Sequence, residues 1–354
     1  MSSHSHAGVI SKNHLWQKNR LKVCFAQKLK DLKDVKLPVN LESLSKTFTP
    51  FPDNIADLAI EAVKESFSIP LTAVEFYGFQ DCGRHSDFDV ALVYLDEPEA
   101  LLTAGSIGDP HSKTSILIRS GFIDFFRKDW QLFQGFLIQN ELSNKSAFQN
   151  GDAFSNDVLK RAIVHEFGHV LGLFHEHSRQ DVPRFARLPL FDDFSKNIER
   201  MHLDLENSSY SSHEVSHFNI NATMGYYWFT FMRLKLRLDA ICSSSISFDD
   251  NRFHSFLNDF AGKLLFLDPK QYKNIFSQRS FDSRALCTTI EPILNLFTHH
   301  GDSLYLEGSD IEALKFGYLG DTTESAPSRP SQNLNELNEI FFESVSSYIQ
   351  LFSI

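Results

Sequence analysis

The sequence lacks the features of several common classes of protein. No run of about twenty uninterrupted apolar residues occurs in the 354-residue chain, so we expect no membrane-spanning helix. Asp and Glu number 45 against 34 Lys and Arg, which gives a net charge of -11. Nucleic-acid binding needs clustered basic residues, so this charge balance argues against it. The longest basic stretch, residues 232–237 (MRLKLR), is interleaved with leucine and suits a half-buried strand equally well.

Cysteine is also scarce. The four cysteines are far apart and form no CxxC pair, so we expect neither a zinc knuckle nor a dithiol redox site. A long-range disulfide between Cys24 and Cys82 and fully reduced thiols are both consistent with their positions. Residues 1–20 contain no apolar core of a secretory signal peptide. We therefore expect secretion or translocation by a route that needs no such peptide; the alternatives are a cytoplasmic protein and a leader that lies outside this sequence.

Apolar periodicity predicts a chain that mixes strands and helices. The apolar residues alternate or run continuously in four predicted strands, within residues 15–26, 73–79, 88–95 and 114–119. They recur at helical spacing in two predicted helices, residues 54–66 and 306–318. The 34 phenylalanines are scattered along the chain, and we interpret them as core residues. The pattern predicts an α/β (α+β) fold with a mixed sheet.

Residues 165–179 read HEFGHVLGLFHEHSR, a spacing suited to one catalytic zinc ion. If residues 156–171 form one helix, His165 and His169 lie about 40° apart around its axis and roughly 6 Å apart along it. Their imidazoles therefore point the same way. Gly172 permits the chain to turn back, because glycine accepts the left-handed conformation that ends helices. His175 would then complete three nitrogen ligands and leave a fourth position for water.

Glu166 directly follows the first of these histidines. Its carboxylate is placed to take a proton from a zinc-activated water as general base. The alternative interpretation is a helix that carries histidines without binding a metal. The combined register of His165, Glu166, His169, Gly172 and His175 favours the zinc site.

The stretch HEFGHVLGLFHEHSRQD resembles the metzincin signature HExxHxxGxxH, and Glu176 after the third histidine narrows the resemblance to the astacin family, in a bacterial type. Three further segments are similar to parts of that family: LW at residues 15–16, GSIG at 105–108, and LEGSDIEALKFGY at 306–318. The resemblance implies a zincin-like, two-lobed catalytic domain with a long active-site helix along the cleft.

The resemblance also implies roles for residues beyond the histidines. Met224 matches the methionine of the Met-turn, which lies beneath the metal site and supports the ligands by packing. Tyr226 matches the tyrosine that astacins use as a further zinc ligand and as a hydrogen-bond donor to the oxyanion, with Tyr227 as a neighbouring alternative. Glu176 matches the glutamate that pairs with the processed N-terminus in that family.

Two departures from the family pattern are visible. Gly225 stands where astacins usually have histidine, and the cysteines do not reproduce the usual disulfides. We predict four parts of the chain: a flexible N-terminal segment (1–14), an upper lobe (15–175), a lower lobe (176–320) with an insertion at about 229–305, and a C-terminal linker and tail (321–354).

These motifs together predict a zinc-dependent endopeptidase that hydrolyses protein or peptide substrates, with Glu166 as its base. The alternative is a catalytically degenerate astacin-like protein that acts as a protein-binding module or a translocated effector. In that case the insertion and the C-terminal tail would make the contacts.

Overall fold

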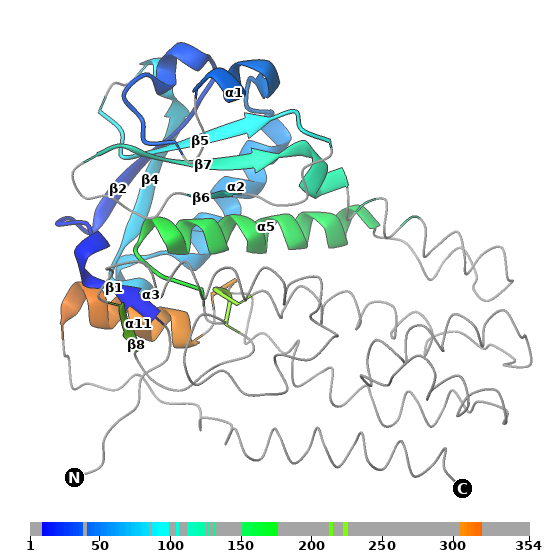
Figure 1. The fold of residues 1–354 in the computed structure, drawn as a ribbon. Helices are drawn as coiled ribbons and strands as arrows, with labels where there is room; N and C mark the ends of the chain where they lie inside the picture. Colours follow the sequence, from blue (N-terminus) through cyan, green and yellow to red (C-terminus); the bar gives the residue numbers. More distant parts are fainter. Residues whose placement is uncertain are drawn as a thin grey trace, which may run out of the picture.

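A computed structural model of the protein describes a mixed sheet with helices on both of its faces. In Figure 1 the sheet lies above the long helix α5, and α11 lies below that helix. The helices and the mixed sheet agree with the predicted α+β class. The described residues are 9–37, 41–84, 87–98, 104–105, 112–124, 127, 131, 151–175, 212–214, 222–225, 305–306 and 308–320.

Among the described residues the main sheet has six strands, with β4, β2, β5, β7 and β6 as successive neighbours. The pairs β4 with β2, β2 with β5, and β5 with β7 are parallel, whereas β6 pairs antiparallel with β7 and β3 pairs antiparallel with β5. Four of the strands fall where apolar periodicity predicted them. The bounds are β2 Arg20–Phe25, β3 Phe48–Thr49, β4 Glu75–Asp81, β5 Val90–Leu95, β6 Ala104–Gly105 and β7 Thr114–Arg119.

The longer helices also follow the predicted pattern. In α2 the buried residues recur at helical spacing on the side that faces the sheet. None of the described helices has the length and apolar character that crossing a bilayer requires. In the part of the chain that the structure describes, the helical elements are η1 Lys12–His14, η2 Leu29–Leu32, α1 Leu41–Thr47, α2 Asp53–Ser66, α3 Ile69–Thr72, η3 Cys82–Arg84, α5 Gly151–Val170 and α11 Gly308–Leu319.

Strand β5 shows how the sheet divides the interior into two cores. Val90 and Leu92 pack against α2 and α5 in the helix-side core, whereas Ala91, Val93 and Leu95 pack on the opposite face. Successive side chains of a strand point to opposite faces, so a strand covered on both sides must be apolar at every position. The sequence VALVYL meets that requirement.

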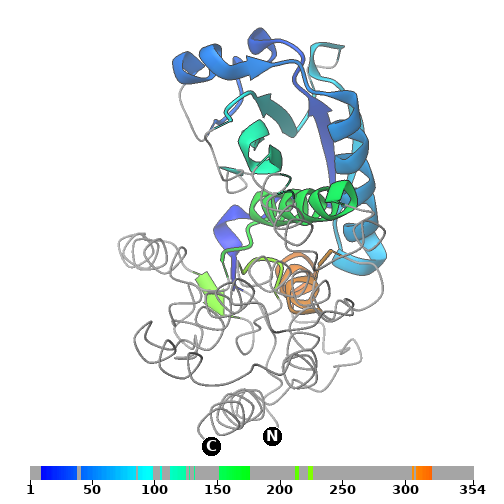
Figure 2. The ribbon, with the colours of Figure 1, turned by 90° about the vertical axis from the view of Figure 1, so that its right-hand side faces the viewer.

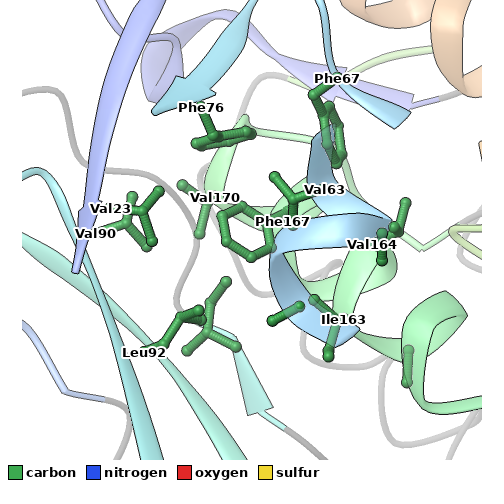
Figure 3. Packing of buried hydrophobic residues seen from close by; sticks show 14 of the residues in the cluster. Val23, Val63, Phe67, Phe76, Val90, Leu92, Ile163, Val164, Phe167 and Val170 are labelled. Atoms are coloured by element: carbon green, nitrogen blue, oxygen red, sulfur yellow. The ribbon is translucent and has the colours of Figure 1, made fainter. Parts of the chain in front are cut away.

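Phe167 fixes α5 against the helix-side core. Its ring is fully buried, and its centroid lies 4.6 Å from that of Phe76 on β4 and 6.2 Å from that of Phe67, just after α2. Figure 3 shows this ring between the strands on one side and Val63 of α2 on the other. Because one face of α5 is held on the sheet, its opposite face is directed toward α11, as Figure 2 also shows.

A small second sheet lies at the C-terminal end of α5. It pairs β1 (Val9–Ser11) antiparallel with β8 (Ser212–Glu214). Ile10, within the segment 1–14 that the sequence predicts to be flexible, is fully buried in the helix-side core. The predicted insertion, the C-terminal tail and most of the lower lobe lie outside the described residues.

A disulfide joins Cys24 of β2 to Cys82, which directly follows β4. Both cysteines are buried in the core on the outer face of the sheet. Of the two alternatives that the sequence left open, the structure therefore has the disulfide. Bonds of this kind persist in oxidising compartments.

Removal of this disulfide should destabilise the sheet. Its cysteines are 58 residues apart, so the bond restricts a long loop in the unfolded chain. We expect Cys24→Ala combined with Cys82→Ala to lower the free energy of unfolding by about 2–4 kcal/mol in urea titrations. The matched control is Cys242→Ala with Cys287→Ala. An equal loss in both double variants would contradict a specific role for the Cys24–Cys82 bond.

Candidate metal centre

The candidate site begins in the last turns of α5, which carry His165 and His169. The two residues are four apart in a continuous helix, so their side chains lie one above the other on the same side. His165 is only 2% exposed. Their common direction is the one that the sequence predicted.

A glycine turn ends the helix and brings the chain back. Gly172 has φ of +89°, in the left-handed region that favours glycine. Its N–H donates to the carbonyl of His169 at 3.0 Å, and the N–H of Leu173 donates to the carbonyl of Gly168 at 3.0 Å. These two bonds form a Schellman motif, which satisfies carbonyls that the end of the helix would otherwise leave without partners.

Groups from both ends of the chain support this turn. The indole N–H of Trp16 donates to the carbonyl of Val170 at 2.9 Å, and the N–H of Ser11 donates to the carbonyl of Gly172 at 3.0 Å. The hydroxyl of Tyr318, from α11, donates to the carbonyl of Leu171 at 3.3 Å. Burial raises the pKa of the Tyr318 phenol above its ordinary value of 10.0, so the phenol stays protonated as a donor.

The three histidines converge through their ring nitrogens. The Nε2 of His175 lies 3.1 Å from that of His165 and 3.0 Å from that of His169. The three candidate ligand atoms all lie within 4.8 Å of one another. Nitrogens bound to one tetrahedral zinc at about 2.0–2.1 Å are separated by about 3.3 Å, so the group is close to the size that such an ion requires.

Backbone carbonyls determine which nitrogen of two rings is available. The Nδ1 of His165 lies 2.7 Å from the carbonyl of Thr223, and the Nδ1 of His169 lies 2.8 Å from the carbonyl of Leu173. A carbonyl only accepts, so each Nδ1 carries the proton and each Nε2 presents a lone pair. Metal-bound histidines in proteins are held in this way. The residues present therefore fit a zinc ion.

Glu166 lies next to the first histidine of the site in α5. It follows His165 in α5, precedes His169 by three residues and is 5% exposed. Residues three apart on a helix are neighbours on its surface, so Glu166 shares a side of α5 with His169. A buried carboxylate beside a metal site has the chemistry of a proton acceptor.

Met224 packs beneath the helix that carries the ligands. It is 1% exposed and belongs to the helix-side core. A Cβ added at Gly168 would come into steric overlap with the Met224 sulfur and lie 3.3 Å from its Cε. Glycine at position 168 therefore allows the thioether to approach the backbone of α5 between His165 and His169.

The structure accounts for part of the predicted site. It brings together His165, His169 and His175, with Glu166 beside them in α5 and Met224 packed on that helix. Two further predicted residues, Tyr226 and Glu176, lie outside the described residues and remain predictions.

Sequence reasoning did not identify Thr223, Trp16 or Asp310 as contributors to the site. Trp16 drew attention only through the family resemblance. Asp310 lies near the start of a helix that the sequence predicts, where an acidic residue is common. Neither the resemblance at Trp16 nor the helix start at Asp310 predicts the contacts that these residues make with Val170 and Thr223.

Comparison with known families agrees with this geometry. The model of the peptidase family described as Astacin matches residues 154–248, a stretch that includes the three histidines, Glu166 and Met224. The match and the histidine triad together support an astacin-like zinc metallopeptidase.

The other two comparisons add little. The search of curated proteins finds no match. A solved structure described as the GM1-bound form of the ECX AB5 holotoxin has 14% sequence identity and a TM-score of 0.27. That likeness covers 51% of this chain and 63% of the other, and we draw no conclusion from it.

The contact between Gly168 and Met224 predicts an unusual response to alanine. In a helix interior, Gly→Ala alone should stabilise by about 1 kcal/mol. Here the added methyl group overpacks a buried site, which costs about 1–3 kcal/mol. We therefore expect Gly168→Ala to lower the free energy of unfolding by about 1 kcal/mol in urea titrations.

A double-mutant cycle with Met224→Ala tests the cause of that loss. Truncation of Met224 removes the overlapping atoms, so the combined variant should be more stable than the sum of the two losses predicts, by at least about 0.5 kcal/mol. Additive losses would contradict steric conflict between these two residues.

Proposed function

We propose that the protein is a zinc-dependent endopeptidase in which Glu166 acts as general base. The observation that carries this proposal is the convergence of three histidine Nε2 atoms, two of which have their Nδ1 atoms held by backbone carbonyls. The family match over the same residues supports the assignment.

His165, His169 and His175 would hold the zinc ion as neutral imidazoles. Bound zinc in such sites supplies polarisation of a carbonyl oxygen and activation of water as a nucleophile near neutral pH. The carbonyls of Thr223 and Leu173 keep two of these rings in the required tautomer. The protein's own contribution is therefore a ligand set that needs little rearrangement.

In the proposed reaction, Glu166 acts first as a base and then as an acid. Its carboxylate accepts a proton from the water that attacks the peptide carbonyl, and it then donates that proton to the leaving amine. The burial of Glu166 places this transfer away from bulk water. We further propose that Tyr226 donates a hydrogen bond to the oxyanion, a role that the astacin resemblance implies.

A strand edge beside α5 suits an extended substrate. Strand β6 is the last strand in the order of the main sheet and contributes an antiparallel partner to β7. It also contacts α5. We propose that a peptide adds to this edge through main-chain hydrogen bonds, which bind many sequences with similar strength. Side-chain pockets would then determine the specificity.

Replacement of Glu166 by Gln should abolish most activity while the site stays assembled. Loss of a general base typically lowers the rate by about 10²–10⁴-fold. We expect kcat/KM on casein-derived peptides to fall by at least about 10²-fold, with zinc content unchanged by metal analysis. Glu42→Gln, at an exposed position of α1, is the matched control and should retain parental activity. Zinc-loaded Glu166→Gln that cleaves at the parental rate would eliminate the proposed role of this residue.

Removal of zinc should affect both activity and stability. A ligand that binds only the folded state at 100 times its Kd stabilises that state by about 2.7 kcal/mol. We expect treatment with a chelator to abolish cleavage and to lower the melting temperature, and zinc but not magnesium to restore both. A protein that binds zinc and cleaves no peptide in a proteome-derived library would instead favour the non-catalytic alternative.

A further inference from the structure

Thr223 is held by two residues of the C-terminal segment, Tyr305 and Asp310, and its carbonyl contacts a histidine of the metal centre. Its N–H donates to the Oδ2 of Asp310 at 2.7 Å, and its hydroxyl donates to the carbonyl of Tyr305 at 2.5 Å. Its own carbonyl faces the Nδ1 of His165 at 2.7 Å. Thr223 is fully buried, and its contacts with Asp310 and His165 are made away from bulk solvent.

Asp310 is the acidic member of this group. It lies in the first turn of α11 and is fully buried. A carboxylate is stabilised near the N-terminus of a helix by the helix dipole, and its bond to a backbone N–H is stronger than one between neutral groups. The Oδ2 of Asp310 is therefore an acceptor whose position is fixed by its own helix.

Tyr305, the other anchor of Thr223, is linked to α5. The Nζ of Lys160 lies 5.8 Å from the centroid of the Tyr305 ring and forms an ion pair with Glu61 of α2. Tyr305 thus contacts the helix that carries the ligands. The two anchors of Thr223, Tyr305 and Asp310, are five residues apart in the chain.

The connection from Asp310 to His165 is geometric. The N–H and the carbonyl of Thr223 belong to different peptide groups, so polarisation does not pass directly from one to the other. Fixing the N–H and the hydroxyl instead fixes the orientation of the residue, and therefore the direction of its carbonyl. That carbonyl determines the tautomer of His165 and the direction of its Nε2.

We infer that Asp310 is a positioning residue for the metal centre. Asp310 lies 87 residues after Thr223 in the chain. By holding Thr223, it orients the His165 imidazole for metal binding. This inference rests on the proposed zinc site. The alternative is that Asp310 only stabilises α11. In that case any change that destabilises α11 equally would weaken zinc binding equally.

The experiment compares Asp310→Ala and Asp310→Asn with Leu314→Ala. Leu314 is fully buried in α11 and belongs to the helix-side core, so its truncation weakens the same helix through a cavity. The apparent zinc Kd of the full chain is measured by competition with a chromophoric chelator. Folding is checked by circular dichroism, and the visible spectrum of the cobalt-loaded protein reports ligand geometry.

We expect Asp310→Ala to weaken zinc binding about tenfold, the lower end of the range for residues that orient metal ligands, and to alter the cobalt spectrum. Asp310→Asn should show a smaller loss, because the amide oxygen still accepts the Thr223 N–H. Leu314→Ala should lose stability while its zinc Kd and cobalt spectrum stay close to those of the parent.

Equal weakening of zinc binding in Asp310→Ala and Leu314→Ala would overturn the inference, as would parental affinity in Asp310→Ala. If Asp310→Ala does not fold, the zinc Kd of Asp310→Asn is the test. A zinc Kd equal to that of the parent in Asp310→Asn would overturn the inference. A parent that binds zinc without cleaving peptides removes the proposed peptidase activity only, since the comparison of zinc affinities is unaffected. A parent that binds no zinc overturns both proposals.

Discussion

The left-handed conformation of Gly172 closes α5 just after His169, and the geometry of the metal centre depends on that end. A helix that continued would carry position 175 away from the first two ligands. The Schellman bonds close the helix and return the chain, so that His175 reaches His165 and His169. The carbonyl of Leu173, which belongs to the same turn, orients His169. One turn thus supplies both the third ligand and the alignment of the second.

The orientation of α5 around its own axis is set by packing on its two sides. Phe167 inserts between the sheet and α2, and Gly168 admits Met224 against the helix backbone. A rotation of the helix would have to break both contacts. The ligand side chains therefore point in a direction determined by the core, and the ordering cost of the site is met when the protein folds.

The parts that the sequence predicted are those with strong local signals. Strand β5 is almost wholly apolar, and β7 has an apolar centre at residues 116–118. Helix α2 repeats its apolar residues at helical spacing, and the histidine motif lies within eleven consecutive residues. The parts that it missed depend on distant contacts. Strand β1 is three residues long and is ordered by the burial of Ile10, and the contact of Asp310 with Thr223 leaves no periodic trace in the chain.

The C-terminal position of α11 has a consequence for biosynthesis. The groups that hold Thr223, and the Tyr318 hydroxyl that donates to the end of α5, lie beyond residue 304. A nascent chain is made from its N-terminus, so all three histidines and Glu166 leave the ribosome well before these supports exist. Completion of the metal centre is therefore a late event in synthesis, and a chain truncated before α11 contains the whole zinc motif without the residues that orient it.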